Sequence, residues 1–361
     1  MKSLQIMSPS FEKLGELALY ESLSMTRSYY GTGSISITID PRVKNAAALQ
    51  PNSIVFFGDE SEQAYIIEDV SPVERSKMTV KGCMLKGYAK RYICIPPASA
   101  EAREYQDFGW DRFTGSAEAA YLHFADVNMV NPDDVTRKLP AMFLSENNEV
   151  GPVLPWQARF DKLDQLFRNI GETTEVGWNI LQDIENKRFV FKAWNGLDRT
   201  QGSDLCLISE ENGNASEITY KYVSSGSAST IYVGGSGEDE NRFVISVGGE
   251  NAFPNRREIW AEAGSIDDPE LLKLYGTNKL TDAAPKETLI AKLIDSGACK
   301  YGRDYDVGDK VIISGRGRVS KIRLVEMTKT YEKGAVSLSG VFGDSVATVE
   351  RVLEARKDAI R

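Results

Sequence analysis

Apolar and polar residues alternate at both ends of the chain, and this period of two predicts β-strands there. The clearest case is residues 34–39, where three isoleucines alternate with Ser34, Ser36 and Thr38. The isoleucines define the buried face of a half-buried strand. The opposite face, formed by Ser34, Ser36 and Thr38, is either exposed surface or the wall of a channel.

A meander of three strands is predicted twice. The first copy covers residues 52–57, 64–68 and 78–82, and the second covers residues 304–313, 321–326 and 335–340. The spacing between the copies is the same at two pairs of positions, Glu68 with Glu326 and Gly82 with Gly340. Insertions collect in surface turns while the pleat keeps strand register, so this spacing predicts a duplicated β-barrel. The alternative is chance, because any two apolar meanders look alike and the copies share few identical residues.

The middle of the chain has a helical period before strands return. Ser116 is placed to cap a helix, and residues 163–170 predict a second helix that Gly171 would stop. A hairpin with strands at 177–180 and 188–191 follows. Further short strands are predicted at 217–222, 230–233, 242–247 and 257–260.

Two more helices are predicted toward the end of the sequence. Asp268 caps a helix that begins at Pro269 and buries Leu271, Leu274 and Tyr275. Residues 346–360 form the second, whose apolar stripe packs on its own chain or on another subunit.

Together these patterns predict an α+β fold that is mainly β, with two similar small β-barrels and two domains inserted between them. A chain of 361 residues is expected to form more than one domain. The expected parts are a first barrel at 1–97, an α+β domain at 98–200, a β-rich domain with a bridging helix at 201–282, a second barrel at 283–345 and a terminal helix at 346–361.

Composition places the chain among globular proteins and argues against nucleic-acid binding. Hydrophobic residues make up 42% and charged residues 26% of the sequence, as is typical of soluble domains. Acidic residues number 52 against 43 basic ones, and the net charge of −9 disfavours a broad phosphate-binding surface. No signal peptide or membrane-spanning stretch is found, so we expect folding in a cytoplasm and no membrane partner.

No residue pattern predicts catalysis, a cofactor or a metal site, so the protein is expected not to be an enzyme. His123 is the only histidine, and no nucleophile motif accompanies it, so a surface or partly buried helix position is expected. The acidic, glycine-rich loop 234–240 lacks the lysine and helix of a phosphate-binding loop and the ligand spacing of a calcium loop. It therefore predicts a solvated turn.

The cysteines are expected to be free thiols. They are far apart, show no CxxC spacing and have no histidine cluster to complete a zinc site. The four are Cys83, Cys94, Cys206 and Cys299.

Several stretches together resemble the siphovirus tail protein family often described as gene-product-thirty-seven-like. The similar stretches are residues 26–33, 64–68, 79–87, 186–191, 196–200, 232–238, 256–258 and 301–309. Their order and spacing over most of the chain carry the resemblance, rather than any one of them. Cys83 stands where the family more often has a polar residue.

The resemblance implies a structural tail-tip or baseplate hub of a siphovirus. Such hubs are homotrimers in which two barrels per chain make a pseudo-sixfold ring that docks on the hexameric tail tube. The implied partners are the distal tail or tail tube ring, tail fibre or tip proteins, and genomic DNA that passes through the lumen during ejection without specific binding. Ser34, Ser36 and Thr38 are then candidate channel-lining residues. The expected location is the virion, after assembly in the host cytoplasm.

Two other functions stay open at this point. One is a cell-wall-binding or peptidoglycan-degrading tail component that holds sugar on Trp178, Trp194 or Trp260, although such tryptophans are more often core residues. The other is a phage-derived injection particle that carries no genome.

Overall fold

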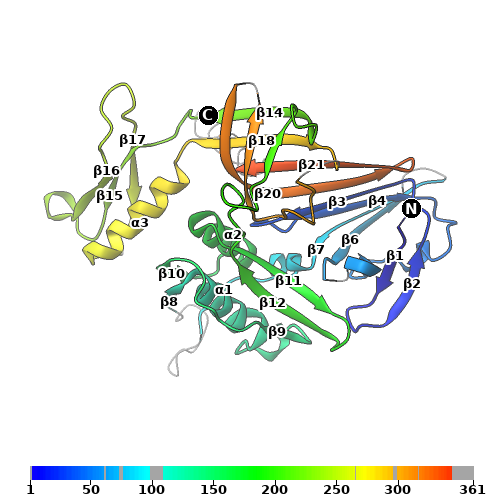
Figure 1. The fold of residues 1–361 in the computed structure, drawn as a ribbon. Helices are drawn as coiled ribbons and strands as arrows, with labels where there is room; N and C mark the ends of the chain where they lie inside the picture. The colour runs from blue at the N-terminus through cyan, green and yellow to red at the C-terminus, as the bar shows by residue number, and fades with distance from the viewer. Residues whose placement is uncertain are drawn as a thin grey trace. The chain divides into compact units, whose positions relative to one another are not determined.

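The computed structural model describes residues 2–60, 62–72, 76–97, 109–264, 266–295, 299–315 and 317–343. The chain forms two compact units, one of Met1–Ile218 with Ala291–Phe342 and one built around Thr219–Ile290. Strands predominate over helices (Figure 1), which confirms the expected α+β, mainly β class. None of the described helices is long and apolar enough to cross a membrane.

A large, mainly antiparallel sheet organises the first unit, and its pairing of β13 with β19 is parallel. Its strands follow the order β21-β20-β3-β4-β7-β6-β5-β1-β2, and β19 pairs with β20 and β13 beside this path. The bounds are β1 (Leu4–Met7), β2 (Lys13–Leu17), β3 (Ser22–Ser28), β4 (Ser34–Ile39), β5 (Ile54–Phe57), β6 (Tyr65–Pro72), β7 (Met78–Met84), β13 (Leu207–Ser209), β19 (Lys310–Gly315), β20 (Arg318–Glu332) and β21 (Ala335–Gly343).

The predicted meander occurs twice in this sheet, although the first strand of the second copy begins at Lys310 and not at the predicted residue 304. Strands β5-β6-β7 and β19-β20-β21 are both consecutive antiparallel neighbours, and the middle strand of each carries a β-bulge. Beyond them, β14 (Ala215–Val223) and β18 (Lys286–Leu293) continue the order as β14-β18-β21-β20, which corresponds to β3-β4-β7-β6. The strand order of the first copy is therefore repeated in the second.

The bulges correct the predicted equivalence of the two copies. Register shifts between Ile67 and Asp69 in one copy and between Leu324 and Glu326 in the other. Aligning the bulges makes Asp69, not Glu68, the counterpart of Glu326. By the same register the counterpart of Gly82 is Phe342 rather than Gly340, because Ile67 faces Gly82 and Leu324 faces Phe342. Matching by residue type missed this, since the copies differ in turn length and only hydrogen bonding reveals the register.

The two copies are joined edge to edge within one chain. Strand β20 pairs antiparallel with β3, from Glu326 opposite Ser28 to Glu332 opposite Ser22 (Figure 1). Among the described residues the strand order is open, and no closed barrel is formed. Residues from opposite ends of the sequence are therefore direct neighbours in one sheet.

The helical segment of the first unit packs on an aromatic core. Helix α1 (Ala117–Ala125) is capped as expected, because the Ser116 side chain accepts a hydrogen bond from the Ala119 N–H. Strand β8 (Asp111–Ser116) pairs with β10 (Val153–Ala158), and β9 (Met142–Leu144) joins the predicted hairpin of β11 (Gly177–Asp183) and β12 (Arg188–Trp194).

Helix α2 (Leu163–Thr174) extends past the predicted stop at Gly171 and ends at Glu175, which has a φ of 58°. Gly171 serves packing instead, because a Cβ there would lie 2.6 Å from the Tyr30 ring. Phe167 of α2 packs against Trp178 at a ring separation of 4.8 Å. The glycine is thus required by a close approach, not by a turn.

Besides residues 219–223 of β14 and 286–290 of β18, the second unit contains a three-stranded sheet and one helix. The strands of this sheet are β16 (Val244–Gly248), β15 (Thr230–Gly234) and β17 (Glu258–Glu262), and the helix is α3 (Pro269–Asp282). Asp268 caps α3 as predicted. The predicted buried face is wrong at Leu271, which is exposed, while Leu272 is fully buried. The buried face of α3 differs from the predicted one because Leu272 and the small Gly276 contact the sheet. The predicted helix at 346–360 lies outside the described residues.

Candidate functional site

One face of the large sheet is lined by hydroxyl side chains, and we call it the hydroxyl face. Its members share a face because antiparallel partners that stand directly opposite each other project to the same side. They are Ser22, Ser24, Thr26, Ser34, Ser36, Thr38, Ser71, Thr79, Thr328, Thr330, Ser337 and Ser339. The predicted residues Ser34, Ser36 and Thr38 lie at its centre, on β4.

Rows of this face cross the boundary between the two copies. One row runs from Ser337 of β21 through Thr330, Ser24 and Ser36 to Lys81 of β7. Hydroxyl pairs are close where β3 meets β20: Thr26 and Thr328 are 2.8 Å apart, and Ser24 and Thr330 are 3.4 Å apart. The face is therefore continuous over both copies.

The opposite side of the same strands is apolar. Leu23, Ile35, Ile37 and Ile39 are fully or almost fully buried in one hydrophobic cluster. Ser34 is exposed, and Ser36 and Thr38 are partly exposed. The alternation of residues along β4 therefore places apolar side chains in the buried core and hydroxyl side chains on the solvent-exposed face, as the sequence predicts.

Little charge interrupts the hydroxyl face. Lys81 stands opposite Asp69, so their charges offset one another, and the carboxylates Glu326 and Glu332 lie at the two ends of the β20 side of the face. Neutral hydroxyls hydrogen-bond water and make no strong ion pairs with phosphate.

A half-buried ion pair supports the sheet where the two copies meet. Arg27 of β3 donates from Nη1 to Asp306 Oδ1 at 2.6 Å and to the Tyr301 hydroxyl at 2.8 Å. Burial disfavours the charged guanidinium, but Tyr301 and Asp306 outweigh burial and raise the pKa of Arg27. The pair ties the first copy to the segment that enters the second.

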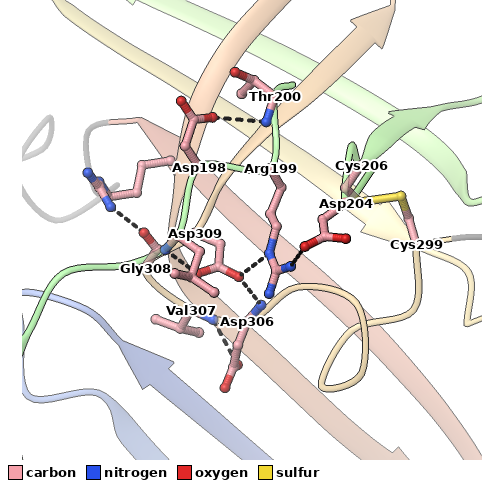
Figure 2. Close-up of polar contacts among 12 residues, drawn as sticks. Asp198, Arg199, Thr200, Asp204, Cys206, Cys299, Asp306, Val307, Gly308 and Asp309 are labelled. Carbon is pink, nitrogen blue, oxygen red and sulfur yellow. Dashed lines mark hydrogen bonds and ion pairs between the residues drawn. A yellow bond between two sulfur atoms is a disulfide. The ribbon is translucent and has the colours of Figure 1, made fainter. Parts of the chain in front are cut away.

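Asp309 connects two segments that are distant in sequence (Figure 2). Its carboxylate accepts hydrogen bonds from the Leu197 N–H at 2.8 Å and the Asp306 N–H at 3.1 Å, and it pairs with Arg199 at 3.4 Å. Gly196 is needed beside it, because a Cβ there would lie 1.8 Å from the Gly308 carbonyl oxygen. The structure thus joins the stretches 196–200 and 301–309, both of which carry the family resemblance.

An open pocket of about 410 Å³ lies at this junction, with Arg27, Trp194 and Arg199 in its wall. Its arginines are paired with carboxylates, Arg27 with Asp306 and Arg199 with Asp309. Such pairs hold loops in place and offer no acid and base poised for catalysis.

Lys86 is fully buried at the C-terminal end of β3. Its Nζ donates to the backbone carbonyls of Ser28 at 2.6 Å, Trp178 at 2.9 Å and Tyr29 at 3.2 Å. Its nitrogen also lies 5.0 Å from the Trp178 ring centre. Lys86 therefore fixes the end of β3 against the hairpin.

The cysteine prediction is wrong for one pair. Cys206 and Cys299 form a disulfide, with their Cα atoms 5.5 Å apart (Figure 2). They are 93 positions apart in sequence, and only the fold brings them together. Cys83 and Cys94 are free, as predicted, and both are buried.

The remaining candidates give no catalytic or metal site. His123 Nε2 lies 2.9 Å from Asp111 Oδ1 and its ring stacks on Phe113. Among the described residues no group of histidine, cysteine and acidic side chains could hold a metal ion. Trp178 is fully buried, whereas Trp260 is half exposed and lies under the Arg242 guanidinium.

Sequence reasoning found three of the twelve members of the hydroxyl face. The alternation in β3 and in the middle of β20 signals five of the others, but only strand pairing shows that all twelve share a face. Arg27, Lys86 and Asp309 each lie in a stretch that carries the family resemblance, but no sequence pattern indicates which residues they contact.

The fold is similar to those of solved phage tail proteins. The crystal structure of the prophage MuSo2 43 kDa tail protein from Shewanella oneidensis matches with a TM-score of 0.60 and 10% identity, over 94% of this chain and 98% of that one. The tail protein from Neisseria meningitidis MC58 matches with a TM-score of 0.56 and 11% identity, over 96% and 97%. The prophage tail protein gp18 from Listeria monocytogenes EGD-e matches with a TM-score of 0.54 and 11% identity, over 98% and 100%.

No curated protein sequence matches the chain. The model of one protein family, however, matches residues 3–344, which is nearly the whole sequence. The chain therefore belongs to the family of Siphovirus ReqiPepy6 Gp37-like proteins.

Proposed function

We propose that this chain is a structural component of a phage tail that acts as the hub of the tail tip. The family supports a role in a siphovirus, and solved tail proteins share the fold over almost their whole length. The family and these solved tail proteins also support a structural rather than an enzymatic role.

The observation that carries the proposal is the repeat within one chain. The order β3-β4-β7-β6 recurs as β14-β18-β21-β20, and β3 joins the copies by pairing with β20. In the assembled hub each copy closes into a small barrel, the first within residues 1–97 and the second from residues 283–345 together with β14. Three chains then supply six similar modules, which is what a trimer needs to dock on a sixfold tail tube.

The hydroxyl face is the proposed wall of the central channel, with Ser34, Ser36 and Thr38 lining it. A trimer of chains with a net charge of −9 repels DNA, and the nearly neutral face adds no strong phosphate contact. Genomic DNA would pass such a wall during ejection without specific binding.

The proposed partners follow from this position in the virion. The distal tail or tail tube ring lies above the hub, and tail fibre or tip proteins lie around and below it. The chain is assembled in the host cytoplasm and then remains at the tail tip.

Native mass spectrometry and negative-stain imaging of the purified chain with its tail tube protein test the hub. We expect a complex of three copies that forms a ring at one end of the tube. A chain that stays monomeric and does not bind tube ends would overturn the proposal.

Thiol labelling of the variant Ser36→Cys tests the channel. A bulky maleimide should block DNA ejection from particles that carry this variant, whereas the same reagent on Phe253→Cys, a position that is 94% exposed on the second unit, should not. Equal effects at both positions would remove the channel assignment.

One observation favours a second candidate, a cell-wall-binding component. Trp260 is half exposed on β17 and the Arg242 guanidinium lies 5.4 Å from its ring, so an aromatic group and a cation stand together at the surface of the second unit. Zymography on peptidoglycan and binding to cell-wall sugar separate the two, because Trp260→Ala would abolish binding only in this second case.

A further inference from the structure

Half of β6 is an open sheet edge. Strand β5 pairs only with its first residues, Tyr65 and Ile66. From Asp69 to Pro72 the strand pairs with β7 on one side, and no described strand pairs with its other side. Such an edge exposes unpaired backbone donors and acceptors, which favours addition of another strand.

The second copy shows how the equivalent edge is filled. Alignment of the bulges makes Asp69 the counterpart of Glu326, so the open half of β6 corresponds to the half of β20 that begins at Glu326. That half of β20 is paired with β3, antiparallel and over seven residue pairs. The same backbone position is therefore filled in one copy and open in the other.

The strand equivalent to β3 is available to fill the open edge. In the order β14-β18-β21-β20, β14 has the place that β3 has in β3-β4-β7-β6. It pairs with β18 and is the last strand of its order, so within the described residues its outer edge has no partner strand. An open β6 edge and an open β14 edge on each chain are complementary.

We propose that Asp69–Pro72 of β6 pairs antiparallel with β14 of a second copy of this chain, in the way that β20 pairs with β3 within one chain. This inference rests on the proposed trimer and names the strands that hold it together. In this arrangement β14 of each chain pairs with β6 of the next chain. Such a head-to-tail contact forms a closed ring when the rotation from one chain to the next adds up to a full turn. Pro72 has no N–H to donate, so it limits the length of the added ladder.

The pairing extends the hydroxyl face between chains. Ser71 of β6 corresponds to Thr328 of β20, which stands opposite Thr26 of β3. The residue of β14 that takes the place of Thr26 must project to the same side as Ser71. Positions on β14 therefore contact Ser71 with a period of two.

Disulfide crosslinking between chains tests the proposal. Ser71→Cys is combined, one at a time, with Thr219→Cys, Tyr220→Cys, Lys221→Cys and Tyr222→Cys. We expect crosslinked chains on a non-reducing gel for one alternating pair of positions, either 219 and 221 or 220 and 222, and at least tenfold less for the other pair. Chains with two different tags show that the bond joins different copies.

The matched control replaces Ser71→Cys with Thr38→Cys. Thr38 lies on the same face, but β4 is paired on both sides within the chain. Crosslinking of Thr38→Cys equal to that of Ser71→Cys, or no alternation along β14, would overturn the proposal. A trimer in native mass spectrometry without any of these crosslinks overturns the pairing but leaves the hub, whereas the absence of a trimer overturns both.

Discussion

Replacement of Lys86 by methionine should destabilise the first unit strongly. Methionine preserves most of the apolar volume but removes the N–H groups that reach the carbonyls of Ser28, Tyr29 and Trp178. A buried acceptor that loses its partner costs about 1–3 kcal/mol. The cost of burying the amine is relieved at the same time, so we expect a net loss of about 2–5 kcal/mol in the free energy of unfolding.

The assay is urea unfolding followed by tryptophan fluorescence, because Trp178 lies next to the amine. The control is Lys90→Met in the same 3-10 segment, Leu85–Arg91. Lys90 makes a partly exposed ion pair with Glu68 at 3.6 Å, so its loss should cost less than about 1 kcal/mol.

The stability loss caused by Lys86→Met should also depend on pH. Burial, followed by the charge of Arg27, lowers the pKa of Lys86 well below its ordinary value of 10.5. Between the two pKa values the unfolded chain binds more protons than the folded chain, so the contribution of Lys86 to stability rises with pH. The stability difference between wild type and Lys86→Met should therefore grow as pH rises toward 10.5. A variant as stable as wild type, or a difference that shrinks with pH, would refute this reasoning.

Two further predictions concern packing and thiol chemistry. Gly82→Ala places a Cβ 1.9 Å from the Ile66 carbonyl oxygen and should lower the free energy of unfolding by about 1–3 kcal/mol, whereas Gly58→Ala, with no atom within 4 Å, should leave the melting temperature nearly unchanged. Burial raises the pKa of Cys83 to about 11 and that of Cys94 to about 12, so iodoacetamide at pH 8 should modify neither in the folded protein. Mass spectrometry should find both modified in urea without reductant, and rapid modification of either in the folded state would contradict their burial.

Local patterns in the sequence predicted most of the elements. The strands at 34–39 and 177–191, the helix capped by Ser116 and the helix capped by Asp268 are all present. Each depends on side-chain period or on a capping residue within one turn, which are local properties. Leu271 shows the limit, because which side of α3 is buried depends on the sheet that covers it.

Contacts between residues that are far apart in sequence could not be predicted from local patterns. The Cys206–Cys299 disulfide and the carboxylate of Asp309 both join segments about a hundred positions apart. No spacing rule marks such pairs, since closing a long loop places little constraint on local sequence.

The sequence by itself determined that Ser34, Ser36 and Thr38 project to one side of a strand, because side chains alternate along any strand. It also indicated that a meander is repeated. The tertiary structure alone decided that β3 lies beside β20, that the bulges set the register of the two copies, and that a few serines belong to a wide hydroxyl face. Strand partners are chosen by packing over the whole sheet, and the side-chain pattern of one strand does not specify which edge it will meet.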